Sequence, residues 1–339
     1  MIVIRRARHT DLNCLMGIST ATGSGMSSMP TSLTSWENKL QKSEESFALE
    51  TTHANGEIYF MVMEDTASRK LVGTTAIYAG VGLDQPFYSY RVSTLISISK
   101  ELEKKNKLEV LHLVNDFTGS TEIGSLYLDP DYRKDRNGRF LSRCRFLMLA
   151  DFPERFDETI IAEMRGWQDK EGHSPFWEQL GRKFFGLGFE NADFMSAVKG
   201  NQFITDLMPR HPIYVDLLPD EARNVIGVPH EASYPAMRLL EKEGFRKSGY
   251  VDIFDGGPTV QCQMRNIATV QKSERRVLSE ILANDSLSDD PYMISNTDLK
   301  NYRFVCTPLV LAEDGTVHIT QETAETLQVE PGQTISFAK

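Results

Sequence analysis

The stretch SLYLDPDYRKDRNGRFLSRCR, residues 125–145, joins a short apolar strand to a helix through a basic turn. Residues 133–145 contain one acid, Asp135, and six basic residues: Arg133, Lys134, Arg136, Arg139, Arg143 and Arg145. The formal net charge of the whole chain is -10, so this is a local cationic segment in an acidic protein. Because a helix N-terminus presents unpaired N–H groups and a partial positive charge, the stretch predicts a site for a phosphate-bearing ligand.

The bulk composition is that of a globular protein. The 339 residues, 40% hydrophobic and 25% charged, provide for about two domains with sizeable cores. The acidic balance argues against a nucleic-acid partner, which needs a broad basic face. The N-terminus lacks the apolar core of a signal peptide, and no stretch is apolar enough to cross a bilayer. We therefore expect a cytoplasmic protein without a membrane partner.

The cysteines and histidines follow no metal-binding pattern. The four cysteines form no C-x-x-C pair, so we expect neither a disulfide framework nor a zinc site. The seven histidines lack spacing such as H-x-x-x-H, and there is no phosphate loop or nucleophile elbow. We expect no bound metal, and the zinc proteases, P-loop enzymes and serine hydrolases are disfavoured.

Hydrophobic periodicity predicts a chain of both strands and helices. The expected segments are an edge-like strand at 1–6, a helix capped by Thr10 or Asp11, a hairpin of 58–63 with 71–78, a second strand pair of 108–114 with 123–128, a helix at 138–150 and a buried strand at 160–164. The tail from 302 to 337 predicts a strand, a turn, a short helix capped at Thr320 or Thr323, a Pro-Gly turn and a last strand.

Two segments after residue 174 share a helix–Gly–Phe–strand pattern, SPFWEQLGRKFFGLGF and YPAMRLLEKEGFRKSGYVDIF. Each glycine would be a left-handed C-cap, and the repetition suggests two related lobes. The alternative is that this is simply a common way for a helix to end. The expected division is an N-terminal lobe at 1–165, a C-terminal lobe at 166–271, a surface helix and linker at 272–301, and a small accessory β module at 302–339.

The pattern R-x-x-x-x-G-x-x-L after the strand end LDPDYR resembles the pyrophosphate loop of the acyl-CoA N-acyltransferase superfamily, which has the acetyltransferase-like fold. That loop carries two glycines; Gly138 takes the second position, and Arg136 stands at the first. A side chain there must adopt an unusual backbone angle or turn outward. The resemblance implies coenzyme A contacts at Arg133, Arg136, Asn137, Gly138 and Arg139. A solvated basic helix start without a ligand is the alternative.

Longer strings are similar to the arginine N-succinyltransferase family through most of residues 1–265: TATGSGMSSMP, VGLDQPFYSYRVSTLISISKEL, NDFTGSTEIGSLYLDPDYRK, AEMRGWQDKEGHSPFWEQLGRKFF, MPRHPIY and DIFDGGPT. The resemblance implies an α+β fold of tandem acetyltransferase-like lobes with mixed, mainly antiparallel sheets. It fades in the tail, where the residue pattern predicts the small β-rich C-terminal module. It also implies transfer of succinyl from succinyl-CoA to the α-amine of L-arginine, giving N2-succinyl-L-arginine in arginine degradation. Succinyl-CoA is then a co-substrate, no cofactor is permanently bound, and the chain could form a homo-oligomer.

The family's functional positions fall on two residues of this chain. Its proton donor corresponds to His230 in VIGVPHEAS, and its succinyl-CoA contact corresponds to Leu126. A histidine with an ordinary pKa near ~6.5 can serve either proton role near neutral pH. The strand backbone at Leu126 could align the thioester or supply an N–H to the oxyanion. Without the resemblance, His230 would be interpreted as a helix cap or a surface residue.

The charged partners of the substrates stay open at this point. Arg91 or Arg165 could pair with the succinyl carboxylate, and Asp252, Asp255, Asp193 or Glu163 could receive the guanidinium. Cys144 has no histidine beside it in the sequence, which disfavours an acyl-cysteine route. Two alternative functions remain: an acyltransferase for ornithine or another small amine, and a non-catalytic acyl-CoA sensor or subunit.

Overall fold

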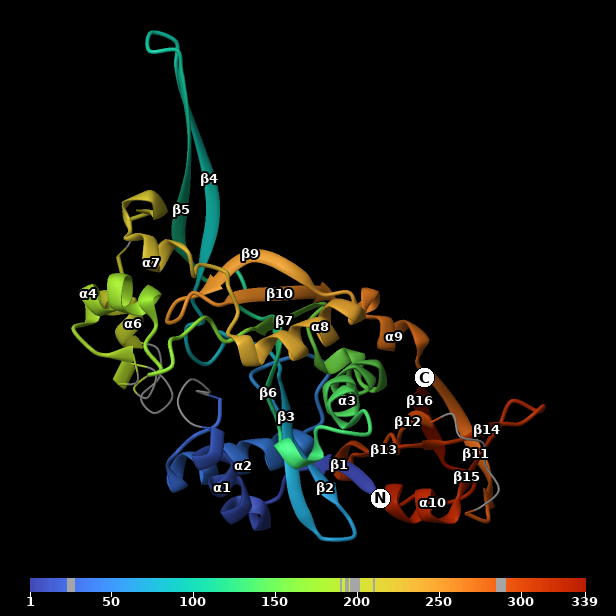
Figure 1. The fold of residues 1–339 in the computed structure, drawn as a ribbon. Coiled ribbons are helices and arrows are strands. Elements are labelled where there is room, and N and C mark those ends of the chain that lie inside the picture. Colours follow the sequence, from blue (N-terminus) through green and yellow to red (C-terminus); the bar gives the residue numbers. More distant parts are fainter. Residues whose placement is uncertain (23–27, 190, 193–194, 196–201, 210, 285–290) are drawn as a thin grey trace.

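A computed structural model describes residues 1–22, 28–189, 191–192, 195, 202–209, 211–284 and 291–339. In these residues a single sheet of 16 strands has the order β14-β15-β11-β16-β12-β13-β1-β2-β3-β6-β7-β10-β9-β4-β5-β8 (Figure 1). Neighbouring described strands are antiparallel except for β6 with β7 and β11 with β15. The predicted α+β class, with a mixed and mainly antiparallel sheet, is confirmed.

The strands of the sheet are β1 (Ile2–Arg6), β2 (Ile58–Asp65), β3 (Lys70–Tyr78), β4 (Ser89–Ser99), β5 (Lys104–Val114), β6 (Thr121–Leu128), β7 (Thr159–Glu163), β8 (Ile213–Tyr214), β9 (Arg246–Asp252), β10 (Pro258–Gln263), β11 (Glu274–Leu282), β12 (Pro291–Ser295), β13 (Arg303–Pro308), β14 (Val310–Leu311), β15 (Val317–Thr320) and β16 (Thr334–Ala338). The helices are α1 (Leu12–Thr22), α2 (Leu33–Ala48), α3 (Asn137–Asp151), α4 (Arg182–Phe185), α6 (Gln202–Leu207), α7 (Asp220–Arg223), α8 (Tyr234–Glu243), α9 (Ala268–Lys272) and α10 (Gln321–Leu327).

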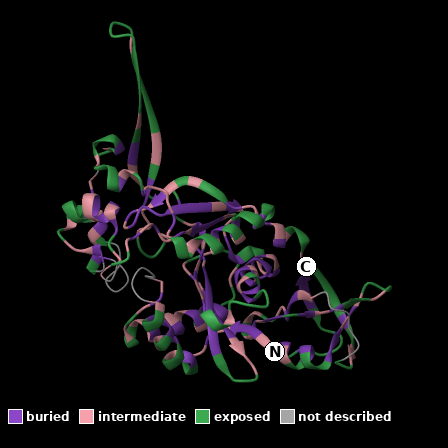
Figure 2. Ribbon diagram, in the orientation of Figure 1, coloured by how far each residue is buried: buried purple, intermediate pink, exposed green. Residues whose placement is uncertain are grey.

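Strand β2 shows how the two faces of the sheet are covered. Its side chains alternate, as a strand period of two residues requires. Phe60 and Val62 join the core beneath α1 and α2, together with Trp36. Met61 and Met63 belong to the core that includes α3 and α8 on the other face. Figure 2 shows the sheet centre and α3 as the buried part of the molecule.

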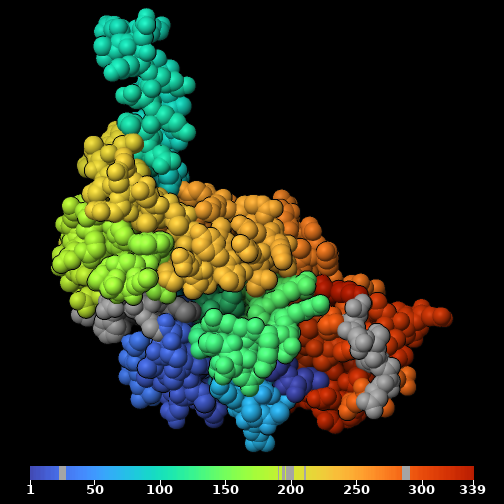
Figure 3. Space-filling view, in the orientation of Figure 1, coloured from blue at the N-terminus to red at the C-terminus, as the bar shows by residue number. Residues whose placement is uncertain are grey.

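The C-terminal strands have a core of their own. Leu278, Ile294, Val317 and Phe337 pack together there, and Val3 of β1 joins them. The short helix α10 begins where the side chain of Thr320 accepts a hydrogen bond from the backbone N–H of Thr323. The β-rich C-terminal module is therefore confirmed, including its capped helix. Figure 3 shows its red surface beside the green surface of α3.

The expected surface helix and linker at 272–301 are wrong. Residues of this range form β11 and β12, which pair with β16 in the same sheet. The leucine and glutamate residues of β11 favour a helix, but pairing with β16 on one edge and β15 on the other outweighs that local preference. The boundaries of the two N-terminal lobes stay a prediction.

Three further expectations are also wrong. Strand β1 is not at an edge, because β13 and β2 flank it. Strands β5 and β6 do not pair: β5 pairs with β4 from Ser89↔Val114 to Ser99↔Lys104, whereas β6 lies between β3 and β7. Among the described residues, the helix–Gly–Phe–strand unit occurs at α8–β9. In the other expected copy, Gly186 ends α4 in the left-handed conformation but Phe189 is helical.

The hairpin of β4 and β5 projects from the body of the molecule (Figure 1, Figure 3). Its outer half is largely exposed, including Ile96 and Ile98. The sequence interpretation assigned no strand to β4 and paired β5 with β6 instead.

Candidate functional site

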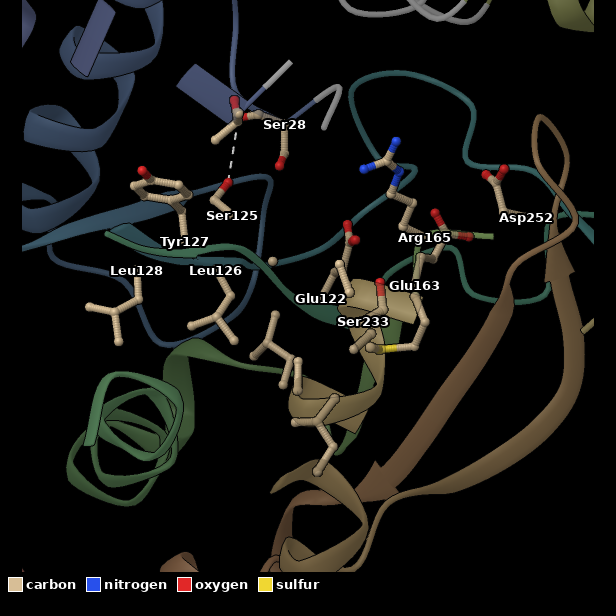
Figure 4. Close-up of a pocket in the computed structure, with 18 of the residues that line it drawn as sticks. Ser28, Glu122, Ser125, Leu126, Tyr127, Leu128, Glu163, Arg165, Ser233 and Asp252 are labelled. Atoms are coloured by element: carbon tan, nitrogen blue, oxygen red, sulfur yellow. Dashed lines mark hydrogen bonds between the residues drawn. The ribbon is translucent and has the colours of Figure 1, made fainter. Parts of the chain in front are cut away.

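Strands β6 and β7 separate after a short contact and leave a cavity between them. They pair only through Thr121↔Ile160 and Glu122↔Ile161. The cavity measures about 470 Å³, and its wall is formed by residues 122–128, residues 162–165, the start of α8, and single residues such as Ser28 and Asp252 (Figure 4). Leu126 and Arg133, both expected at the site, belong to this wall.

A β-bulge in β6 faces the cavity at Ser125. The pairing of Tyr127 with Thr74 and of Gly124 with Ala76 leaves Ser125 and Leu126 together opposite Thr75. Ser125 has a φ of 50°, and its carbonyl oxygen accepts a hydrogen bond from Thr74 Oγ1 at 2.8 Å. Such a bulge interrupts the ladder of backbone hydrogen bonds. Leu126 and Leu128 point towards α3, while Ser125 and Tyr127 point the opposite way (Figure 4).

The basic loop ends in the strained residue that the sequence indicated. Arg136 has a φ of 62° and is the N-cap of α3, so the side chain at the glycine position is accommodated by the unusual backbone angle. Asn137 is buried, and its Nδ2 donates to the carbonyl oxygen of Tyr132 at 3.1 Å. A Cβ on Gly138 would meet only Leu128 Cδ2, at 3.8 Å, so the start of α3 is open. Arg136 and Arg139 are exposed beside it.

His230 is hydrogen-bonded to Arg165, which lies two residues after the end of β7. Its backbone N–H donates to the carbonyl oxygen of Arg165 at 2.8 Å. Its side-chain Nδ1 accepts from the N–H of Ala232 at 3.1 Å and caps the turn before α8. Burial, and then the charge of Arg165, lower the pKa of His230. The imidazole is therefore mostly neutral at pH 7 with its proton on Nε2, which makes it a donor rather than a base.

The described cavity wall does not include His230 itself. It includes Ala232 and Ser233, which follow His230 at the start of α8. The cap interpretation of His230 is correct as local structure, and the same cap fixes the orientation of the ring. Its predicted chemical role stays a prediction.

Four acids, of which Asp255 is buried and the others are half-buried, gather at the end of the cavity away from the loop. Glu122 and Glu163 come from β6 and β7, Asp252 ends β9, and Asp255 follows it; all four line the cavity. Burial raises the pKa of each, and their mutual repulsion adds to the rise for Glu163 and Asp255. Glu163 Oε1 is buried without a hydrogen-bond partner among the described residues. A cation that entered here would relieve this repulsion.

Two of the acids are better placed for a ligand than the others. Both carboxylate oxygens of Asp255 accept backbone N–H groups, from Gly166 at 2.6 Å and from Gly257 at 2.8 Å, whereas Asp252 accepts those of Phe254 and Asp255 through Oδ1 alone. Asp193 lies outside the described residues. Glu163 and Asp252 remain as candidates for a substrate cation (Figure 4).

The two candidate arginines also differ. Arg91 lies on exposed β4 and pairs with Asp116 at 3.4 Å, outside the described cavity wall. Arg165 lines the cavity next to Glu163 and donates to Gln168 Oε1. The structure therefore brings Arg165, and not Arg91, to the site.

Other reactive groups of the chain lie elsewhere. Burial raises the pKa of the Cys144 thiol to about 12, so this cysteine is not a nucleophile at neutral pH. Asp169, Glu171 and His173 come within 4.8 Å of one another on an outer turn, where hydrogen bonds to Asp169 account for their closeness. In the part of the chain described, no helix has the length and hydrophobicity to span a bilayer.

The chain matches two family models end to end. Residues 2–269 match the arginine N-succinyltransferase beta subunit, and residues 274–339 match the C-terminal domain of the same subunit. The chain belongs to the arginine N-succinyltransferase family.

Individual members of the arginine N-succinyltransferase family are similar to this chain over nearly their whole length. The arginine N-succinyltransferase of Escherichia fergusonii is 39% identical, over 91% of this chain and 92% of that protein. The one from Yersinia pestis is 38% identical, over 99% and 97%. The solved structure of arginine/ornithine succinyltransferase subunit AI from Pseudomonas aeruginosa matches with a TM-score of 0.90 and 35% identity, covering 100% of this chain and 98% of that one.

Two residues of the cavity wall were missed in the sequence. Glu122 stands in TEIGSLYL; an acid in an otherwise apolar strand was the available signal. Arg145 was assigned to the basic segment. The apolar residues FLMLA that follow it indicate that this part of the helix is buried. Both residues line the cavity.

Proposed function

We propose that this acyltransferase moves a succinyl group from succinyl-CoA to the α-amine of L-arginine and releases coenzyme A. One observation carries the proposal beyond family membership: a single cavity joins Arg133 of the basic loop to the acidic end at Glu163 and Asp252. An anionic thioester and a cationic amino acid can therefore enter the same cavity from its two ends. Direct transfer between them follows, because Cys144 is outside the described wall and poorly ionised.

The loop and β6 would hold the thioester. The N–H groups at the start of α3, with Arg136 and Arg139, would bind the pyrophosphate. The pantetheine arm would follow Leu128 and Leu126 to the bulge. There the thioester carbonyl would meet backbone N–H groups that the ladder does not use, and these would stabilise the developing oxyanion.

The acidic end would hold arginine. Glu163 and Asp252 would pair with the guanidinium, and Arg165 with a carboxylate of the bound substrates. Burial raises the pKa of Glu122 to about 7, which suits a group that takes a proton from the α-ammonium. The freed amine attacks the carbonyl carbon, the C–N bond forms, and the C–S bond breaks with its electron pair on sulfur.

His230 would assist the leaving sulfur. Because a thiol has an ordinary pKa near ~8.5, the departing thiolate needs a hydrogen-bond donor more than a strong acid. Nε2–H of His230 would provide it, while the second proton lost by the new amide converts the thiolate to the thiol. The Nδ1 cap at Ala232 keeps the ring in that orientation.

The test is thiol release from succinyl-CoA by the full-length protein, with L-arginine, L-ornithine and L-lysine compared as acceptors. We expect release with arginine, and a Glu163→Gln variant with a raised KM for arginine but an unchanged KM for succinyl-CoA. Faster release with ornithine would favour the second amine in the name of the Pseudomonas aeruginosa arginine/ornithine succinyltransferase. No release with any amine would favour a non-catalytic acyl-CoA-binding protein. The cytoplasmic location and the homo-oligomer stay predictions.

A further inference from the structure

Arg145 is a buried cation whose surroundings provide no acid. It is 2% exposed, and it lines the cavity from α3. Its Nε donates to the carbonyl oxygen of Ser142 and its Nη2 to the hydroxyl of Ser142, both at 3.0 Å. Among the described residues, no carboxylate forms an ion pair with it. Both hydrogen bonds are therefore made within its own helix and with neutral groups.

Two other arginines with little exposure are paired with acids, whereas the buried Arg155 donates to the Tyr59 hydroxyl and to the carbonyl oxygen of Leu49. Arg5 holds Asp11 at 2.8 Å and Glu64 at 2.6 Å. Arg143, two residues before Arg145 on α3, holds Glu243 at 3.0 Å. On α3 itself, Arg143 therefore has an acid partner, whereas Arg145 has none among the described residues.

The unpaired charge is costly to the ligand-free protein. Burial lowers the pKa of Arg145 to about 10, which records the loss of hydration without a compensating anion. The cavity wall also includes apolar side chains, among them Leu126, Met164, Ala236 and Leu240. A buried charge on a cavity wall is a frequent mark of a ligand site, because a ligand of opposite charge supplies the missing partner.

We propose that Arg145 is an internal anion site that binds an anionic oxygen group of the thioester co-substrate. The inference rests on the proposed use of an acyl-CoA. Two groups of that ligand have the required chemistry: a phosphate of the coenzyme and the terminal carboxylate of the succinyl group. The hydrogen bonds to Ser142 direct the guanidinium towards the start of α3, where the loop lies.

The experiment measures binding without an acceptor, so its outcome does not depend on turnover with arginine. Dissociation constants for coenzyme A, acetyl-CoA, succinyl-CoA and succinyl-pantetheine are determined by titration calorimetry with the full-length protein and with Arg145→Met. The urea midpoint of each ligand-free protein is measured in parallel. Arg238→Met, at an exposed position on α8, is the matched control. Arg145→Lys tests whether a charge alone suffices.

We expect Arg145→Met to weaken binding by about tenfold or more, because hydrogen bonds to charged groups are the strong ones. Its urea midpoint should equal or exceed that of the wild type, since an unpaired buried charge is removed. Equal weakening for coenzyme A and succinyl-CoA identifies a phosphate as the partner. Weakening confined to succinyl-CoA and succinyl-pantetheine identifies the carboxylate. Arg145→Lys should recover part of the affinity.

Three results would overturn the assignment: unchanged affinity for all four ligands in Arg145→Met, a lowered urea midpoint or failure of that variant to fold, and an equal loss of affinity in Arg238→Met. If the wild type binds acyl-CoA through Arg145 but releases no thiol with any amine, the proposed function fails and the anion site stands. If Arg145→Met binds normally while the wild type succinylates arginine, the reverse holds.

Discussion

The backbone N–H of His230 donates to the carbonyl oxygen of Arg165 at 2.8 Å. The neighbouring N–H of Trp167 donates to the carbonyl oxygen of Val228 at 3.1 Å. These bonds pair the chain after β7 with the chain before α8. His230, for which we propose the role of hydrogen-bond donor to the leaving sulfur, is therefore tied through its backbone to the segment that follows Glu163.

Replacing His230 should lower turnover without removing substrate binding. We expect His230→Ala to reduce kcat by about 10²-fold or more, in the range observed for loss of a proton-transfer group. The dissociation constant for succinyl-CoA should change little, because the described cavity wall does not include the imidazole. Stopped-flow thiol release and calorimetric titration measure the two quantities.

His230→Asn separates chemistry from capping. Asparagine is a good N-cap, so its side-chain oxygen can replace Nδ1 as the acceptor for the Ala232 N–H. We expect this variant to be as stable as the wild type and as slow as His230→Ala. Full activity in His230→Asn would show that only the cap matters. His173→Ala, at an exposed turn, is the control.

Glu122 should make the ligand-free protein less stable as the pH rises. Burial raises its folded-state pKa to about 7, whereas an unfolded glutamate titrates near ~4.3. Between these values the folded state binds more protons than the unfolded state, so the free energy of unfolding falls with increasing pH. The loss is complete above about pH 7, where both states are ionised.

Urea unfolding from pH 4.5 to pH 8 compares the wild type with Glu122→Gln. As the pH rises across this window, the free energy of unfolding of the variant should increase relative to that of the wild type, by on the order of 1 to 3 kcal/mol. In activity, the rise of kcat/KM through pH 7 should disappear in the variant. A constant stability difference between the two proteins at every pH would contradict the assignment of Glu122 as the buried titrating group.

Arg136→Gly should stabilise the loop and weaken the ligand. A non-glycine residue with a φ of 62° is strained, and glycine adopts this conformation freely. We expect a gain of about 0.5 to 1 kcal/mol in the free energy of unfolding. Loss of the cation should raise the dissociation constant for coenzyme A at low ionic strength.

Asp135→Gly is the matched variant, because Asp135 also has a positive φ, of 51°, but the opposite charge. It should give a similar gain in stability and unchanged or tighter coenzyme A binding. Weaker binding in both variants by the same factor would assign the effect to loop rigidity instead of charge.

Much of the loop could be predicted because its signals are local. The strand end at Asp129-Pro130, the basic turn and the apolar face of α3 follow one another directly, and the backbone angle of Arg136 was implied by the missing glycine. Local signals also predicted the hairpin of β2 and β3 and the helix cap at Thr320.

The remainder depended on distant partners. Strand β11 has helix-favouring residues, and its pairing with β16 decides their conformation. The acidic end of the cavity joins residues 122, 163 and 252, which only the completed sheet brings together. Burial of Arg145 likewise depends on α8 covering α3, which residues 125–145 alone do not indicate.

A buried hydrogen-bond group attaches the C-terminal module to α3. The carboxylate of Asp151, at the end of α3, accepts from the hydroxyl of Tyr302 and from Ser295 Oγ at 2.6 Å. We expect Tyr302→Phe to lower the free energy of unfolding by about 1 to 3 kcal/mol, because the buried carboxylate loses a donor. Succinyl-CoA affinity should not change.

Chemical denaturation at pH 7 measures this loss. Tyr292→Phe is the control, because the described residues offer its hydroxyl no hydrogen-bond partner while its ring packs on Phe337. If Tyr302→Phe is as stable as Tyr292→Phe, the hydrogen bonds to Asp151 do not stabilise the C-terminal module.

The central claim is that succinyl passes to the α-nitrogen of arginine. The full-length protein is incubated with succinyl-CoA and L-arginine labelled with ¹⁵N at the α-position, and the product is fragmented in a mass spectrometer. We predict one succinyl group, on the labelled nitrogen, in an amount equal to the thiol released. Succinyl on a guanidinium nitrogen, or thiol release without any succinylarginine, would contradict the account.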